Sequence, residues 1–307
     1  MKMAAHRYPL GVMLAVAAMW SYGPTLSTLL QSWRRHPDYS HGFLVVPLAL
    51  LMLWWRRDSR PHWIGRAGWE ALPVLAMSVA MRWLGALWQA EWLDGWSLVV
   101  WVIGSVWLIG GRRFCLWALP AVGFLIFMVP LPYRLETALS LPLQSLATQL
   151  GSWTLQMLGQ PAMAEGNTIL LDDHRLDIER ACSGLRVLTG VLALGVGYII
   201  VSRRSWWENA VLLLAVLPIA LIANTVRIVA AALALRYWSG SLWADLGHSA
   251  GGWLMIVVAA LLFALFLQYT KSLVFRADEF DARGLVVQQN HGSVFNQDGF
   301  AGVDPIQ

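Results

Sequence analysis

Apolar runs separated by short polar stretches make up most of the chain. A helix that spans a membrane needs about 20 mostly apolar residues, with a range of roughly 17–25. Runs of this kind predict an all-α polytopic membrane protein with about eight transmembrane helices, at residues 10–30, 43–55, 69–88, 96–110, 114–129, 184–201, 210–235 and 251–269. The second and fourth runs are short, so we expect their helices to extend into flanking residues.

The long segment between the fifth and sixth runs, residues 130–181, is less apolar and has two parts. Its first part carries apolar residues at helical spacing, which predicts one or two interfacial amphipathic helices with a bend at Pro142; these residues are Leu135, Leu139, Leu143, Leu146, Leu150, Trp153 and Met157. Its second part predicts a small β-hairpin from 168–171 and 175–179, because turn residues bracket both runs and the second alternates polar and apolar positions.

These patterns divide the chain into two parts. Residues 1–275 are expected to form one integral membrane domain, with 130–181 inserted on its outer side. Residues 276–307 are polar and contain several glycines, which predicts a poorly ordered cytoplasmic tail.

Composition supports the membrane assignment. The chain is 58% hydrophobic and only 13% charged, whereas a soluble domain of this length would carry a more charged surface. The net charge of +4 comes from basic residues clustered in short loops, which indicates topology signals and not a nucleic-acid surface. Two cysteines are too few for a disulfide framework and lack metal-type spacing, so no metal or organic cofactor is indicated.

Basic loops predict the orientation in the membrane. Every second loop is rich in arginine or lysine, namely the loops with Arg56 and Arg57, with Arg112 and Arg113, with Arg203 and Arg204, and with Lys271 and Arg276. Positively charged loops stay in the cytoplasm, so these loops and both termini are predicted to be cytoplasmic. The remaining loops, including 130–181, then face the outside of a plasma membrane.

A cysteine lies where that outer segment meets the sixth apolar run. Arg180 precedes Cys182 by two residues and Arg186 follows it by four, and cationic neighbours lower a cysteine pKa and so favour the reactive thiolate. Arg227 lies about 17 residues into the seventh run, roughly 25 Å along its axis and therefore near the outer boundary. His248 directly precedes the eighth run. We therefore expect Cys182, Arg227 and His248 to lie at one depth in the membrane.

Each of these residues also has a simpler interpretation. A cysteine at a helix start is often a packing residue, Arg227 can reach the interface merely by extending its side chain, and His248 can be a helix cap. Ionisable groups within a membrane are nevertheless costly and commonly functional. Asn224 lies one turn before Arg227 and can share a polar pocket with it. Arg82, in the third run, is a possible second buried contact.

The other cysteine is predicted to be remote. Cys115 opens the fifth run at the cytoplasmic end, so most of the membrane should separate it from Cys182. That separation exceeds the roughly 7 Å limit between the Cα atoms of a disulfide, and Cys182 is predicted to be a free thiol.

Several motifs together resemble the exosortase/archaeosortase family of membrane transpeptidases. They are His41-Gly42-Phe43-Leu44-Val45-Val46-Pro47 running into Trp54-Trp55-Arg56-Arg57, then Glu165-Gly166-Asn167, Ala181-Cys182-Ser183-Gly184-Leu185-Arg186, Asn224-Thr225-Val226-Arg227 and His248-Ser249-Ala250-Gly251-Gly252-Trp253. The resemblance covers roughly residues 20–270. The third position of the catalytic set is a histidine, as in bacterial exosortases.

The resemblance implies a cysteine endopeptidase or transpeptidase in the bacterial inner membrane, with its active site at the periplasmic face. Its expected partners are exported proteins with a carboxy-terminal sorting signal, which combines a short motif such as Pro-Glu-Pro, a transmembrane helix and a basic cluster. Membrane lipids and an acceptor nucleophile of unknown identity complete the set, and no nucleic acid is expected.

The hypothesis for the mechanism is acyl transfer through a thioester on Cys182. His248 would act as general base and then protonate the leaving amine. Arg227 would stabilise the oxyanion or clamp a substrate carboxylate. Arg180 and Arg186 would favour the thiolate or bind lipid phosphates.

Three rivals stay open. A transporter or flippase would use the arginines and the histidine to line a path, although paired interrupted helices in two related halves are not evident. A membrane protease would use water as acceptor or Ser183 as nucleophile. A scaffold of the cell envelope would perform no chemistry.

Overall fold

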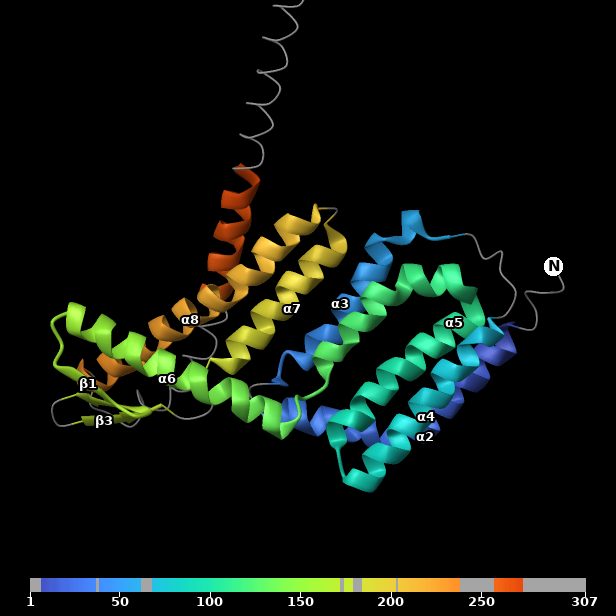
Figure 1. The fold of residues 1–307 in the computed structure, drawn as a ribbon, viewed down its shortest axis with the longest axis horizontal. Helices are drawn as coiled ribbons and strands as arrows, with labels where there is room; N and C mark the ends of the chain where they lie inside the picture. The colour runs from blue at the N-terminus through green and yellow to red at the C-terminus, as the bar shows by residue number, and fades with distance from the viewer. Residues whose placement is uncertain are drawn as a thin grey trace, which may run out of the picture. The chain divides into compact units, whose positions relative to one another are not determined.

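A computed structural model of the chain describes residues 7–36, 39–61, 68–171, 174–178, 184–202, 204–237 and 257–272. Two compact units divide it, Met1–Ala260 and Leu261–Gln307, and each is considered by itself. Most described residues of the first unit lie in helices (Figure 1), and the described part of the second unit lies within the helix Val257–Ser272.

The apolar runs form the helices. In chain order these are α2 (Arg7–Arg35), α3 (Gly42–Trp55), α4 (Leu72–Trp88), α5 (Glu91–Gly123), α6 (Tyr133–Met157), α7 (Leu185–Val201) and α8 (Trp206–Tyr237). Short 3-10 helices η2 (Arg57–Ser59), η3 (Trp69–Ala71) and η4 (Phe124–Met128) border some of them. Each predicted span overlaps a helix of the described residues, although residues 251–256 of the last span lie outside them. A backbone in lipid must satisfy its own hydrogen bonds, as a helix does.

Helix α5 is a helical hairpin that reverses at Gly111. Its φ of 78° and ψ of 173° are not helical, and this backbone region is open essentially to glycine alone. A Cβ on Gly95, near the start of the first arm, would lie 2.6 Å from Val129, and the Cys115 thiol lies 3.9 Å from the Ile103 carbonyl. Each contact joins a residue before Gly111 to one at a similar distance after it, so the two arms are antiparallel. This agrees with the prediction of separate helices at 96–110 and 114–129.

Eight membrane crossings are not confirmed. Among the described residues, four helical stretches are long and apolar enough to cross a membrane, Gly11–Arg35, Trp69–Trp88, Glu91–Met128 and Trp206–Ala234, and the third of them contains the reversal at Gly111. Three shorter apolar helices, Gly42–Trp55, Leu185–Val201 and Val257–Ser272, accompany them. The structure supports a membrane protein, and its exact number of crossings stays a prediction.

Helix α6 confirms a helix over the leucine-rich part of the outer segment, as one element with Pro142 inside it. The stripe Ser140, Gln144, Thr148 and Ser152 is buried, while several large apolar side chains are exposed, among them Leu135, Leu146, Trp153 and Met157. A helix that exposes large apolar side chains fits a lipid or interfacial neighbour.

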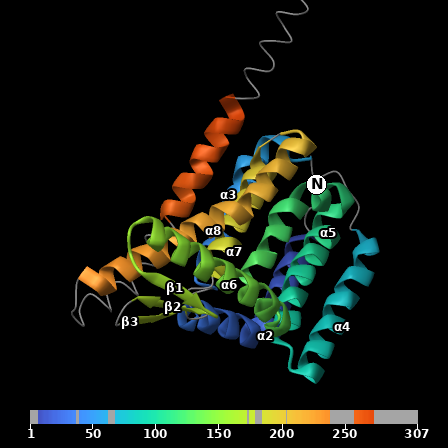
Figure 2. The ribbon, with the colours of Figure 1, turned by 60° about the vertical axis from the view of Figure 1, so that its left-hand side comes forward.

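The predicted hairpin is a three-stranded antiparallel sheet, in the order β1 (Ala162–Glu165), β2 (Thr168–Leu171) and β3 (His174–Asp177). Strand β2 has the predicted bounds, β3 begins one residue earlier, and β1 was missed. A two-residue turn at Gly166 and Asn167 joins β1 to β2, and Gly166 has the positive φ of 60° that such turns require. Ile169 and Leu171 are buried, and Figures 1 and 2 both show α6 alongside the sheet.

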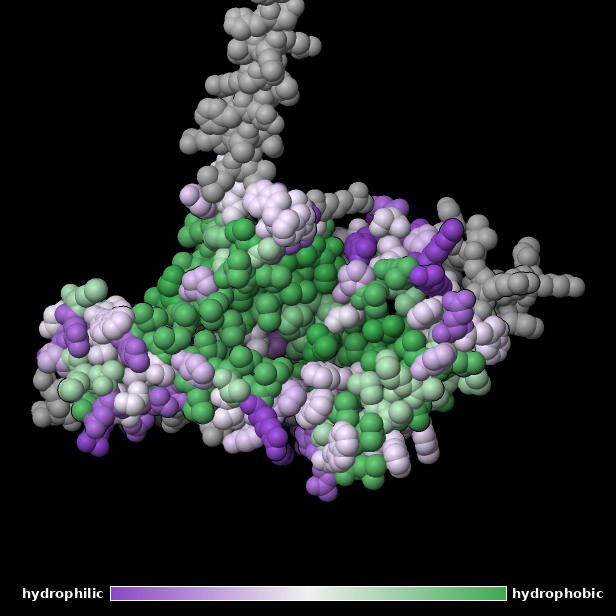
Figure 3. Space-filling model, in the orientation of Figure 1, coloured by the Kyte–Doolittle hydropathy of each residue, from purple (hydrophilic) through white to green (hydrophobic). Residues whose placement is uncertain are grey.

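Two basic turns lie together at one end of the first unit. The indole of Trp117, just after Arg112 and Arg113, donates a hydrogen bond to the Arg56 carbonyl at 3.1 Å. At the same level, a Cβ on Gly197 would contact the Met52 side chain at 2.9 Å, which brings the end of α7 to the end of α3. This grouping agrees with alternation of the loops between two sides of a membrane. Figure 3 shows the broad apolar surface between the helix ends, over α7 and α8.

Candidate active site

Helix α8 turns a polar pair toward the protein interior. Asn224 is 1% exposed and Arg227 is 8% exposed. They stand three residues apart, one turn on the same face, on the side of α8 that packs against α6 and α7. Both residues are therefore buried, as a shared polar pocket requires.

The start of α7 lies against this pair. Gly184 has a φ of 83° and precedes the first helical residue, Leu185. A Cβ at position 184 would lie 3.1 Å from the Cγ and Nδ2 atoms of Asn224. Only glycine combines the left-handed backbone with such close approach, so this position brings the end of the cysteine motif to within one helical turn of Arg227.

The other flank of the cysteine segment is anchored to α6. The side-chain amide of Gln144 donates a hydrogen bond to the carbonyl of Ile178, and the Ile178 N–H donates to the Asn167 carbonyl at 2.9 Å. Ile178 is 4% exposed. Residues 178 and 184 are thus both fixed by buried contacts, one through the sheet and α6 and the other through α8.

A third contact joins the start of α7 to the connection between α2 and α3. The Arg186 guanidinium donates a hydrogen bond to the Ser40 hydroxyl at 3.1 Å. Ser40 directly precedes His41-Gly42, the first motif of the family resemblance. Ser40 was not predicted as a partner of Arg186, since the two residues lie 146 positions apart.

Four of the predicted site residues, Cys182, Ser183, Arg180 and His248, lie outside the described residues. Their meeting with Arg227 therefore stays a prediction. Of the remaining predicted residues, the structure brings Asn224 and Arg227 together on α8 and directs Arg186 toward Ser40. The sequence analysis quoted Gly184 within the cysteine motif without assigning it a contact, and it missed Ser40, which directly precedes the first motif.

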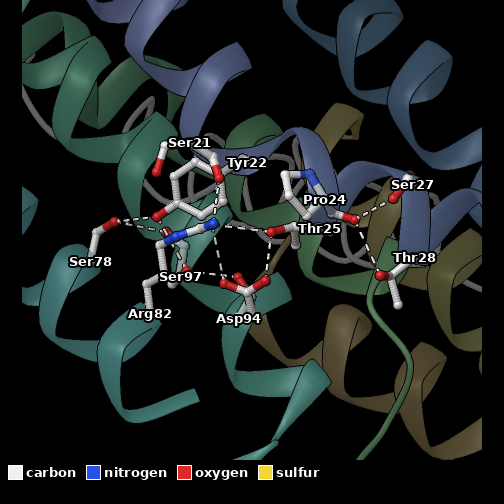
Figure 4. Close-up of polar contacts among 10 residues, drawn as sticks. All are labelled: Ser21, Tyr22, Pro24, Thr25, Ser27, Thr28, Ser78, Arg82, Asp94 and Ser97. Atoms are coloured by element: carbon white, nitrogen blue, oxygen red, sulfur yellow. Dashed lines mark hydrogen bonds and ion pairs between the residues drawn. The ribbon is translucent and has the colours of Figure 1, made fainter. Parts of the chain in front are cut away.

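Arg82 belongs to a separate polar cluster at the junction of α2, α4 and α5 (Figure 4). Its guanidinium pairs with the Asp94 carboxylate at 3.2 Å, donates to the Thr25 hydroxyl at 3.1 Å and to the Ser21 carbonyl, and lies 4.4 Å from the ring centroid of Tyr22. All the partners drawn come from these three helices. Arg82 thus makes the buried contact expected of it, but with α2 and α5 and not with α8.

Cys115 has a buried environment in the second arm of α5. Its side chain is 5% exposed, just after the basic turn that contains Arg112 and Arg113. This position is the one predicted for a thiol remote from the outer segment. Among the described residues, no group of three His, Cys, Asp or Glu side chains is placed to hold a metal ion.

Comparison with known families gives one match. The family model for transmembrane exosortase (Exosortase_EpsH) matches residues 33–265, which include every motif quoted above. No curated protein and no solved structure matches the chain.

Proposed function

The chain belongs to the transmembrane exosortase family, and from this premise we propose that it is a membrane cysteine transpeptidase that cleaves the carboxy-terminal sorting signal of exported proteins. The family is one of cysteine proteases and transpeptidases, and membership supports a sorting role in general terms. The substrate signal combines a Pro-Glu-Pro-like motif, an apolar helix and a basic cluster. The reaction takes place at the periplasmic face of the inner membrane.

In the proposed reaction the Cys182 thiolate attacks the scissile carbonyl carbon. His248 accepts the thiol proton and then transfers it to the leaving amine as the C–N bond breaks, which leaves a thioester on Cys182. An acceptor nucleophile (water, an amine or a hydroxyl) then gives a proton to His248 as it attacks the thioester carbonyl carbon, and the C–S bond breaks to release the acylated acceptor and the Cys182 thiolate. Arg227 stabilises the negative charge of the tetrahedral oxyanion, a role in which one donor contributes about 2.7–4 kcal/mol.

The observation that carries this proposal is the packing of Gly184 on Asn224, one turn from the buried Arg227. Cys182 lies two residues before Gly184, and two residues of chain span at most about 7 Å. Asn224 and Arg227 are separated by a rise of roughly 4.5 Å along α8. Both distances are short enough for the Cys182 sulfur to reach the Arg227 guanidinium, which supports a shared site.

Arg227 has a second possible role as a clamp for the glutamate of the recognition motif, because guanidinium groups bind carboxylates with two parallel hydrogen bonds. Substrates that carry Glu or Gln in the motif separate the two roles. A clamp predicts that Arg227→Lys raises KM for the Glu substrate alone. An oxyanion role predicts that the same variant lowers kcat for both substrates.

The nucleophile is tested by substitution in cells that export a reporter with the sorting signal. Cys182→Ser and Cys182→Ala should both leave the reporter unprocessed, while Ser183→Ala and Cys115→Ala should process it. A processed reporter in the Cys182→Ser strain would exclude the thioester. Tolerance of Cys182→Ala together with loss of function in Arg227→Ala would instead favour the transporter hypothesis.

Thiol labelling tests the predicted location in the same cells. A membrane-impermeant maleimide applied from outside should modify Cys182 and leave the buried Cys115 unmodified. Cys182→Ala and Cys115→Ala serve as the matched single-thiol controls. Labelling that persists in Cys182→Ala and disappears in Cys115→Ala would contradict the proposed orientation.

A further inference from the structure

The first turn of α7 is held from two sides. On one side Gly184 packs against Asn224 of α8. The other contact is made by Arg186, the second residue of α7. Its guanidinium donates to the Ser40 hydroxyl, in the connection between α2 and α3, at 3.1 Å.

Ser40 belongs to a connection that is itself fixed. The hydroxyl of Tyr39 donates to the Glu136 carboxylate at the start of α6 at 3.0 Å. The imidazole Nε2 of His41 lies 3.1 Å from the Phe127 carbonyl in η4. The residues on both sides of Ser40 therefore bind other elements, so that Ser40 offers Arg186 an anchored acceptor and not a mobile one.

The preceding helix end is fixed as well. The Trp33 indole donates to the Met128 carbonyl at 2.8 Å, and a Cβ on Gly42 would collide with that indole. Trp33, Tyr39 and His41 are thus tied to η4 and α6, which lead into the outer segment. The Arg186–Ser40 hydrogen bond extends this anchoring to the helix that follows the cysteine motif.

We propose that Arg186 is a positioning residue and Ser40 its anchor: their hydrogen bond holds the first turn of α7 so that Cys182 is presented to the Arg227 face of α8. This inference rests on the proposed function. It differs from an electrostatic role, in which the positive charge of Arg186 would stabilise the thiolate, and from lipid phosphate binding. In the positioning role the hydrogen-bonding geometry of the guanidinium matters more than its charge.

The positioning and electrostatic roles of Arg186 are separated by three variants in a Cys115→Ala background: Ser40→Ala, Arg186→Lys and Arg186→Gln. Purified enzymes in proteoliposomes are assayed with a synthetic peptide that carries a Pro-Glu-Pro motif, an apolar helix and a basic cluster. Because misplacement of a reacting group by about 1 Å costs up to 100-fold in rate, we expect kcat to fall about tenfold or more in all three variants, with KM nearly unchanged. Arg175→Gln, which removes an exposed arginine from β3, should retain wild-type kcat.

The pH dependence of Cys182 alkylation separates positioning from thiolate stabilisation. Positioning predicts the same midpoint in wild type, Ser40→Ala and Arg186→Lys. Thiolate stabilisation predicts a raised midpoint in Arg186→Gln, full activity in Arg186→Lys and no effect of Ser40→Ala. The second set of results would overturn the proposal, as would wild-type kcat in Ser40→Ala.

Hydrogen exchange distinguishes failure of the proposal from failure of the proposed function. The amides of Leu188, which donates to the Gly184 carbonyl, and of Thr189 should exchange faster in Ser40→Ala than in wild type if the contact holds the helix start, whether or not the protein is a transpeptidase. An inactive Cys182→Ser beside a fully active Ser40→Ala would remove the positioning role alone. An active Cys182→Ser beside faster exchange in Ser40→Ala would remove the catalytic function and keep the contact.

Discussion

Replacement of Arg82 by methionine should destabilise the fold strongly, because it leaves the Asp94 carboxylate without its cation inside the helical bundle. Removal of one partner from a buried ion pair costs about 3–5 kcal/mol. The two side chains are 27% and 26% exposed, so solvent screening reduces this figure. The contact with the Tyr22 ring contributes about 1 kcal/mol of its own. We expect a net loss of about 2–4 kcal/mol in the free energy of unfolding.

A double-mutant cycle measures the part that belongs to the pair. Arg82→Met, Asp94→Asn and the double variant are unfolded in mixed micelles by titration with sodium dodecyl sulfate. The double variant contains no unpaired charge, so it should be less destabilised than the sum of the single changes, by about 1–3 kcal/mol. Arg57→Met is the matched control, because the Arg57–Asp58 pair is exposed and its loss should change stability by no more than about 0.5 kcal/mol.

Two outcomes would refute this reasoning. If Arg82→Met is as harmless as Arg57→Met, the guanidinium does not hold α2, α4 and α5 together. If the effects of Arg82→Met and Asp94→Asn simply add, the two groups do not stabilise each other, and the short distance between them has no energetic consequence.

Two further predictions concern the flanks of the cysteine segment. Gly184→Ala must place a Cβ against Asn224 in a left-handed backbone, which costs about 1–2 kcal/mol, so both the melting temperature in detergent and the processing of an exported reporter should fall. Gly190→Ala is the control, because Gly190 lies inside α7 with open space where its Cβ would be, and it should be neutral or stabilising. Equal behaviour of the two variants would contradict the contact between Gly184 and Asn224. Gln144→Leu removes the buried amide that donates to the Ile178 carbonyl, just before the cysteine segment. Loss of this hydrogen bond should lower the free energy of unfolding by about 1–3 kcal/mol, measured by titration with sodium dodecyl sulfate. Gln149→Leu, on the exposed face of α6, is its control and should unfold like the wild type, whereas an equal loss in both would mean that the buried hydrogen bond contributes nothing.

Hydrophobic patterning predicted the helices because length and apolarity determine which segments can lie in lipid. It also separated the two arms of α5, since the polar Arg112-Arg113 pair interrupts the apolar run. It missed β1 because a four-residue strand with the sequence Ala-Met-Ala-Glu carries little β propensity. That strand forms through its pairing with β2, which a local pattern does not contain.

The site was predictable only in part. The spacing of Asn224 and Arg227 showed that they share a face of α8, but their burial depends on the packing of α6 and α7 against that face. Similarly, the basic surroundings of Cys182 were visible in the sequence, whereas the link from Arg186 to Ser40 connects residues far apart in the chain. Long-range contacts of this kind follow from the tertiary fold and not from local spacing.

The reversal at Gly111 has a consequence for everything that follows it. In the predicted topology each arm of α5 crosses the membrane separately, so the turn decides whether an even or an odd number of crossings precedes α6. Without the turn the two arms would form one straight helix, and all later loops would be exchanged between the two sides of the bilayer. The side on which the proposed site lies is then encoded, in part, by one backbone conformation that a residue with a side chain cannot readily adopt.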